Sequence, residues 1–99
     1  MNYIDDIAKR IQAQLADEAI PDDEPESLMR LYALLALTKG IRVTAEDVHN
    51  AWSVWSTDRG EWDHESLVPF SDLSSQAQHL DDQYVAAIRR AAEQLRGHA

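Results

Sequence analysis

The stretch that decides the fold is SLMRLYALLALTK, residues 27–39. Its apolar side chains cover almost the whole circumference of a helix instead of one stripe, which is typical of a buried helix. Gly40 follows as a stop signal, and Lys39 just before it favours the negative end of the helix dipole. We therefore predict a central, largely buried helix over about residues 26–39, with Ser27 as a candidate N-cap.

An amphipathic helix is predicted before the central one, because apolar residues recur three or four positions apart. They are Ile4, Ile7, Ile11 and Leu15. The pattern fades near Asp17 and Glu18. Residues 19–26, AIPDDEPE, then combine two prolines with four acidic residues, which predicts a rigid, solvated connector.

A third helix is predicted from the sequence TAED, residues 44–47. Thr44 followed three residues later by Asp47 is a capping-box variant, with Asp in place of Glu or Gln. Apolar residues continue at helical spacing, and the helix is expected to end near residues 57–60.

The last part of the chain is expected to hold an extended segment and two helical pieces. Pro69 forbids helix in LVPF, residues 67–70, and favours extended backbone. A short helical turn capped by Ser71 or Ser74 should follow, through His79. The final helix is predicted over about residues 83–96, after a cap at Asp81 or Asp82, with Gly97 as its stop.

These patterns predict one all-α domain over residues 1–99. Its architecture is expected to be a compact bundle of four main helices plus a short extended LVPF segment and a short helical turn. The helix over residues 26–39 should lie at its centre, with the other three main helices packed around it.

The composition excludes several classes of partner. The sequence has nine Lys and Arg and 18 Asp and Glu, which gives a net charge of −9. Binding to nucleic acid or to an anionic membrane instead needs a basic surface. No cysteine is present, which rules out disulfides and thiol nucleophiles and favours a cytoplasmic protein. The sequence begins without the pattern of a signal peptide, and no apolar run reaches the roughly 18–20 residues of a membrane span.

Enzyme motifs are missing from the sequence. Its three glycines are isolated, so there is no glycine-rich phosphate loop, and no serine elbow is present. The four histidines, at positions 49, 64, 79 and 98, contain no i, i+4 pair, so no metal site is predicted. His79 near Asp81 and Asp82 could do acid–base chemistry, but without a nucleophile or pocket signal it is read as a surface group. We expect no enzyme, no cofactor and no metal.

Three tryptophans, Trp52, Trp55 and Trp62, fall within eleven residues. Trp and Arg are enriched at binding hot spots, so a ligand or partner face is predicted. Its residues are Trp55, Arg59, Trp62 and His64. The alternative is that the tryptophans pin the loop DRGEWDHES, residues 58–66, onto the helices.

Residues 49–88 resemble a ryanodine-receptor repeat domain. The residues that carry the resemblance are His49, Trp52, Trp62, His64, Leu67–Phe70, Leu73, Gln78 and Asp81. Phe70 departs from the usual Tyr of that pattern, and Gln78 falls where a Lys is common.

The whole chain, with its segments RLYALLALTKG and TAEDVHNAW, is similar to a family of small uncharacterised proteins of actinobacteria and their phages. The two resemblances imply a helical, non-catalytic module that binds a protein or a small, nucleotide-like molecule, in the host cytoplasm if a phage encodes it. A phosphate-rich ligand would require Arg59, Arg89 and Arg90 to gather.

We therefore expect a binding module whose partner is a protein or a small molecule. Three alternatives stay open. One is an acidic phage-type inhibitor of a host protein that presents residues 17–26 to a basic site. The second is a structural adaptor that dimerises through its first helix. The third, ranked last, is an enzyme, whose mark would be a closed pocket that holds a His with a displaced pKa next to Asp81. The ligand, the host target, a phage or chromosomal origin and the oligomeric state do not follow from the sequence.

Overall fold

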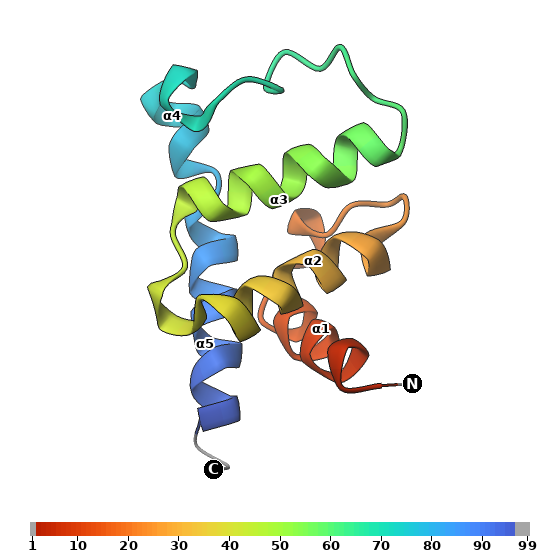
Figure 1. Ribbon diagram of the computed structural model, residues 1–99, viewed down its shortest axis with the longest axis vertical. Coiled ribbons are helices and arrows are strands. Elements are labelled where there is room, and N and C mark those ends of the chain that lie inside the picture. Colours follow the sequence, from red (N-terminus) through yellow and green to blue (C-terminus); the bar gives the residue numbers. More distant parts are fainter. Residues whose placement is uncertain (1, 97–99) are drawn as a thin grey trace.

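Helix α2 (Pro25–Thr38) lies at the centre of the computed structural model, which describes residues 2–96. It packs against α1 (Tyr3–Ala13), α3 (Ala45–Asp58) and α5 (Asp82–Arg96), which confirms the predicted central helix. In Figure 1, α3 crosses above α2, and α5 runs down one side of the molecule past both of them. The predicted stop at Gly97 and the histidine at position 98 lie outside the described residues.

The first turn of α1 is capped by Asn2, whose side chain accepts the Asp5 backbone N–H at 3.0 Å. Ile7 and Ile11 are buried in the core, as the apolar stripe predicts. The helix ends at Ala13, before the predicted boundary. Leu15 nevertheless stays buried, because the chain continues against the core through a 3₁₀ turn, η1 (Asp17–Ala19).

The start of α2 differs from the prediction. Its N-cap is Glu24, in the left-handed region with φ 48°, and Pro25 takes the first helical position. Proline is well suited to that position because its φ is fixed and its missing N–H would have no helical partner. The prediction of Ser27 as the cap was wrong; its hydroxyl instead donates to the Glu24 carbonyl at 2.9 Å.

The apolar side chains of α2 do not all lie in the core. Leu28, Met29 and Tyr32 are fully buried, but Leu34 and Leu37 are 51% and 45% exposed. The three helices that pack against α2 leave its outer side uncovered, so these two leucines face solvent. The sequence of one apolar helix does not predict how many other helices will pack against it.

The predicted capping box of α3 is confirmed. The Thr44 hydroxyl accepts the Asp47 backbone N–H at 3.2 Å, and the Asp47 carboxylate accepts the Thr44 backbone N–H at 2.9 Å. Before it, Gly40 adopts φ 59° and opens a 3₁₀ turn, η2 (Gly40–Arg42), which lets the chain reverse between α2 and α3.

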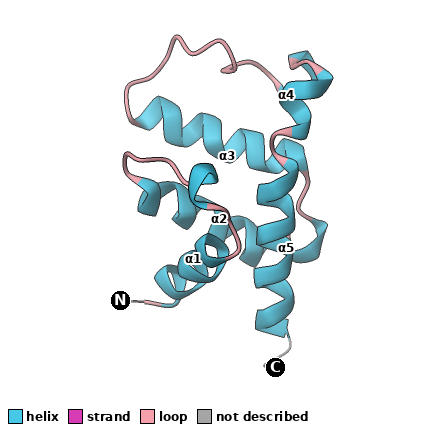
Figure 2. Ribbon diagram, turned by 180° about the vertical axis from the view of Figure 1, so that it is seen from behind, coloured by secondary structure: helices cyan, strands magenta, loops and turns pink. Residues whose placement is uncertain are grey.

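Residues 59–81 form a long excursion that returns over α3 and leads into α5 (Figure 2). Pro69 is extended, as predicted, with φ −54° and ψ 147°, but Phe70 already begins a 3₁₀ turn, η3 (Phe70–Asp72). The predicted short turn is α4 (Ser75–His79), and the Ser74 hydroxyl caps it by accepting the Ala77 N–H at 3.1 Å.

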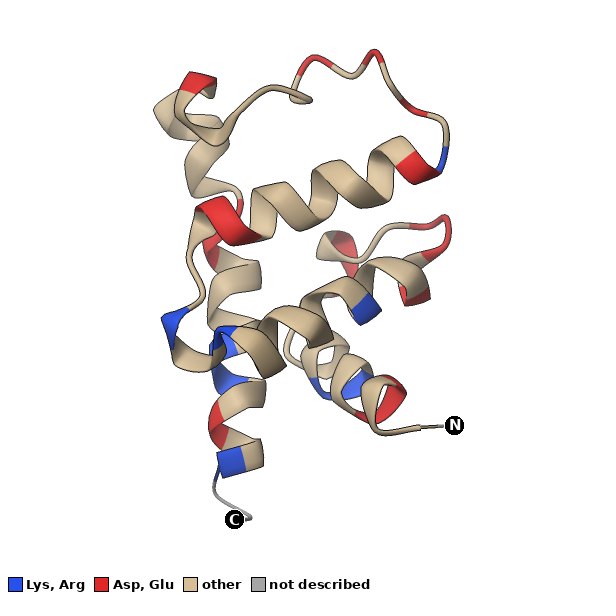
Figure 3. Ribbon diagram, viewed as in Figure 1, with Lys and Arg blue, Asp and Glu red and all other residues tan. Residues whose placement is uncertain are grey.

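The fold is an all-α bundle, as predicted, and residues 2–96 contain no strand. Within the same residues, no helix has the length and apolar character that crossing a membrane requires. Figure 3 shows acidic residues along the loop between α3 and α4 and on the connector before α2, whereas several basic residues lie on α1, η2 and α5.

Candidate functional site

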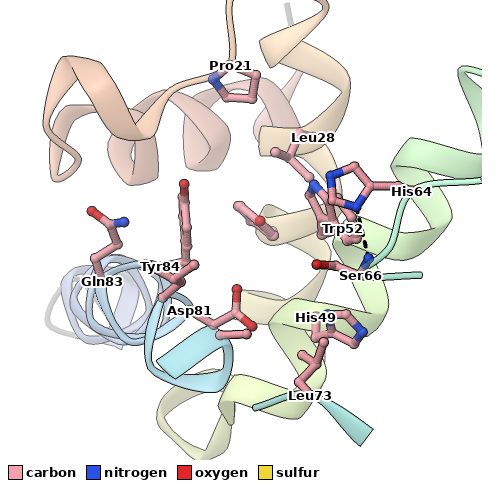
Figure 4. Close-up of a pocket in the computed structure, with 13 residues that line it drawn as sticks. Pro21, Leu28, His49, Trp52, His64, Ser66, Leu73, Asp81, Gln83 and Tyr84 are labelled. Atoms are coloured by element: carbon pink, nitrogen blue, oxygen red, sulfur yellow. Dashed lines mark hydrogen bonds between the residues drawn. The ribbon is translucent and has the colours of Figure 1, made fainter. Parts of the chain in front are cut away.

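A pocket of about 320 Å³ opens where the 59–81 excursion rejoins the bundle. Its walls come from the connector before α2, from α2, α3 and the loop after α3, and from α4 and the start of α5. Figure 4 shows Tyr84 on one side, Trp52 and His64 on the other, and Asp81 near His49. A volume of this size is typical of small-molecule sites.

His49, a residue of α3, forms one part of the wall. It is almost fully buried, and its Nε2 lies 2.7 Å from the Val68 carbonyl oxygen. Because a carbonyl oxygen can only accept, Nε2 carries a proton and donates it. The ring also stacks on Trp52, with centroids 5.9 Å apart and an interplanar angle of 26°. His49 therefore ties the excursion to α3 and fixes one side of the Trp52 indole.

Trp52 is held on a second side by His64. The two rings meet edge to face, 5.1 Å apart at 78°, and the Ser66 N–H donates to His64 Nδ1 at 3.0 Å. An Nδ1 that accepts a hydrogen bond leaves the ring proton of a neutral imidazole on Nε2. The loop conformation thus orients His64 and, through it, the indole.

Two tyrosines form the opposite side of the pocket. The Tyr84 hydroxyl donates to the Ala19 carbonyl at 2.7 Å, and its ring lies 5.6 Å from that of Tyr32. Burial raises the pKa of both hydroxyls, and the carboxylate of Asp81 raises each further. Within residues 2–96 the Tyr32 hydroxyl has no hydrogen-bond partner. Both side chains therefore stay neutral at ordinary pH.

Asp81 directly precedes α5, but its side chain does not cap the helix. Its carboxylate accepts no hydrogen bond from any of the described residues, and it lines the pocket. Partial burial raises the pKa of this carboxyl to about 6; His49 works against the rise and Asp82 adds to it. The prediction that Asp81 or Asp82 caps the last helix is thus not met by the Asp81 side chain, which is turned to the pocket.

Trp55 and Arg59, two of the four predicted site residues, form a cluster of their own at the far end of α3. Trp55 is only 6% exposed, and its indole N–H donates to Ser27 Oγ at 2.8 Å and to the Glu24 carbonyl at 3.2 Å. Arg59 pairs with Asp23, with Glu24 at 3.5 Å and with Glu61 at 3.3 Å. These contacts join the end of α3 to the acidic connector before α2.

Trp62 and His64, the other two predicted residues, lie apart from that cluster and from each other. Trp62 is 74% exposed, donates to the Thr57 carbonyl at 2.8 Å and lines a shallow groove with Val68 and Pro69. Only His64 lines the 320 Å³ pocket. The structure therefore divides the predicted face among three places.

Of the described residues that line the pocket, His64 alone was predicted as a binding residue. Trp52 and Asp81 were singled out for other reasons, and Tyr84 was not singled out. The spacing of His49 and Trp52, three residues apart on a predicted helix, could have pointed to a shared face. Nothing local could have brought Tyr84 to that face, because 32 positions separate it from Trp52.

Other candidate sites are weaker. His79 pairs with Asp82 at 3.1 Å, and both side chains are exposed. A larger groove of about 680 Å³ lies between α1 and α2, but its rim carries the Arg30–Asp5 ion pair at 2.8 Å, which already satisfies both charges. No three His, Asp or Glu side chains gather as a metal site in the described part of the chain.

One family model matches this chain, over residues 2–93, and its description reads "Domain of unknown function (DUF7701)". Neither the curated proteins nor the solved structures contain a match.

Proposed function

This chain belongs to the DUF7701 family, and we propose that it is a non-catalytic binding module whose small-molecule ligand occupies the pocket beside Trp52. The observation that carries the proposal is the combination of aromatic walls with polar groups that have no hydrogen-bond partner among residues 2–96. Trp52, Tyr32 and Tyr84 supply the walls, and the Asp81 carboxylate and Tyr32 hydroxyl are the unpartnered groups. Ligand sites of this kind are mostly apolar, with a few polar groups that fix orientation.

The two histidines of the pocket support binding over catalysis. His49 donates to a backbone carbonyl, His64 accepts from a backbone N–H, and both pack against the Trp52 indole. Each ring is thereby used to position the wall. A general base would instead be expected beside a nucleophile, in hydrogen-bond contact with it.

The resemblance of residues 49–88 to a ryanodine-receptor repeat agrees with this proposal, because it also implies a helical, non-catalytic module. Five of the residues that carry the resemblance also line the pocket: His49, Trp52, His64, Leu73 and Asp81. The resemblance, and an actinobacterial or phage origin, stay predictions.

The inhibitor and adaptor alternatives also stay predictions, and each has its own test. An inhibitor that presents residues 17–26 to a basic host protein would bind with an affinity that falls steeply with salt. An adaptor that dimerises through α1 would show a mass that rises with concentration in light scattering. The pocket proposal expects a ligand-dependent change confined to the pocket residues instead.

The direct experiment is a fragment screen followed by ¹H–¹⁵N correlation spectra of the labelled protein. Neutral, cationic and anionic fragments are all included. We expect hits that shift the Trp52 indole N–H and the backbone N–H groups of Asp81 and Tyr84. Hits that cluster at the Trp55–Arg59 end of α3 instead, or no hits at all, would overturn the proposal.

Two variants of α4 provide the control. Ala77 lines the pocket, whereas its neighbour Gln76 is exposed and does not. Ala77→Phe fills the pocket and should abolish binding of the hits, while Gln76→Phe should retain it. If Ala77→Phe disturbs the fold, Trp52→Leu removes the aromatic wall and serves the same purpose.

A further inference from the structure

Asp81 contributes a carboxylate to the pocket, and no Lys or Arg is among the described residues that line it. The titratable bases of the lining are His49 and His64. We propose, building on the proposed function above, that the ligand is a small organic cation, such as a quaternary or protonated ammonium group. Asp81 would be its counter-charge, and the rings of Trp52 and Tyr84 would be its walls.

The three arginines that a phosphate-bearing ligand was expected to need do not gather at one site. Arg89 donates to the Val43 carbonyl at 2.8 Å, Arg90 donates to Gln14 Oε1 at 3.2 Å, and Arg59 pairs with the connector before α2. Three arginines thus bond to three different segments. A phosphate-bearing ligand, which would need them to gather, is not favoured by this arrangement.

The aromatic walls are well suited to a cation. The face of an aromatic ring carries negative potential, so it attracts ammonium groups, and Trp does so most strongly. In Figure 4, Tyr84 and Trp52 lie on opposite sides of the pocket, with Asp81 turned toward the space between them. Ala19 holds Tyr84 by its hydroxyl, and His49 and His64 pack against Trp52, so the walls are fixed before any ligand arrives.

The Asp81 carboxylate supplies the stronger argument. A partly buried carboxylate without a hydrogen-bond donor from the protein is costly, because it has lost part of its hydration and gained no protein partner. Asp81 immediately precedes α5, where a side chain could cap the helix, yet its carboxylate accepts no hydrogen bond within residues 2–96. A cation in the pocket would provide the missing partner, in a partly desolvated setting where the attraction is stronger than in water.

The test compares two probes of nearly the same shape that differ in charge. Choline carries a trimethylammonium group, and 3,3-dimethylbutan-1-ol carries an uncharged tert-butyl group in its place. Dissociation constants are measured by following the pocket resonances in ¹H–¹⁵N spectra at pH 7.5. We expect choline to bind at least about tenfold more tightly than the neutral alcohol.

Two neighbouring carboxylates supply the variant and its control. Asp81→Asn keeps the size of the side chain and should reduce the preference for choline to about threefold or less. Asp82→Asn removes a charge from the adjacent, exposed position outside the pocket and should change the preference much less than Asp81→Asn does. Equal affinity for both probes, or a preference for choline that survives in Asp81→Asn, would show that the pocket does not select a cation.

The outcomes also separate this inference from the function on which it rests. If the neutral alcohol binds as tightly as choline at the pocket, the pocket is a ligand site, but the charge assignment is wrong. If neither probe shifts the pocket resonances, the cation assignment fails, and the fragment screen decides the proposed function independently.

Discussion

The guanidinium carbon of Arg59 lies 4.3 Å from the centroid of the Trp55 ring. This stacking, together with the ion pairs of Arg59 and the two hydrogen bonds of the Trp55 indole N–H, ties the C-terminal end of α3 to the connector before α2. Both residue types are common at binding hot spots. Here the guanidinium pairs with carboxylates of the chain, although Arg59 Nε, 3.5 Å from Glu24, makes no hydrogen bond to any described residue. We place the proposed ligand site elsewhere, beside Trp52.

Trp55 should be essential for stability. Trp55→Ala removes a nearly fully buried indole and leaves a cavity between α3 and α2, so we expect a loss of about 3–5 kcal/mol in the free energy of unfolding. Urea denaturation followed by circular dichroism measures it. A loss below about 1 kcal/mol would mean that the indole is not part of the core.

Trp62 should contribute little to stability, in contrast to Trp55. Its side chain is largely exposed and makes one hydrogen bond, to Thr57. Trp62→Ala should therefore cost less than about 1 kcal/mol under the same denaturation conditions. A loss comparable to that of Trp55→Ala would show that Trp62 instead pins the loop to the bundle.

The capping box of α3 makes a separate contribution. Thr44→Ala removes the acceptor for the Asp47 backbone N–H and should lower the free energy of unfolding by about 1 kcal/mol. Thr57→Ala removes a similar hydroxyl from the far end of the same helix and should change it by less than about 0.5 kcal/mol. Equal effects of the two substitutions would exclude a specific role for the cap.

Asp81 should make stability depend on pH in an unusual direction. Folding raises the pKa of its carboxyl from 3.8 to about 6, so the folded protein holds this proton more tightly than the unfolded chain. The stabilisation that comes from this tighter proton binding is therefore fully present below about pH 4 and is lost as the pH rises through 6. Asp81→Asn should remove this pH-dependent stabilisation. The free energy of unfolding of the variant, relative to that of wild type, should therefore increase between pH 4 and 7. A constant difference across that range would contradict the raised pKa.

The same carboxyl should control the affinity for a cation. A bound cation favours the ionised form, so choline should bind more weakly as the pH falls through about 6, and it should lower the pKa of Asp81. Other titratable groups also face Asp81 or the pocket: His49, His64, Asp82, Tyr32 and Tyr84. Choline titrations of wild type and of Asp81→Asn, compared at each pH, isolate the contribution of Asp81 to the affinity. An affinity of wild type that stays constant from pH 7 to pH 5 would contradict the prediction.

The helices could be predicted because their causes are local. The capping box of Thr44 and Asp47, the apolar stripe of α1 and the extended backbone at Pro69 each depend on a few neighbouring residues, and each is present. The start of α2 failed because Pro25 was read as part of a connector, although proline also favours the first helical position.

The candidate site was harder to predict, because the pocket depends on tertiary contacts. Trp52 becomes a wall only because His49 and His64 pack against it, and Tyr84 reaches the pocket only because its hydroxyl bonds to Ala19, 65 positions away. Neither relationship leaves a local pattern. Asp81 was predicted as a helix cap or as a partner of His79, and no local pattern indicates that its side chain lines a pocket.

The most direct measurement follows the three indole N–H signals in ¹H–¹⁵N spectra while choline is added. The tryptophans report on three separate environments: the pocket at Trp52, the core at Trp55 and the exposed loop at Trp62. Binding in the proposed pocket predicts a saturable shift of the Trp52 signal alone. A saturable shift at Trp55 or Trp62, with the Trp52 signal unchanged, would contradict the account.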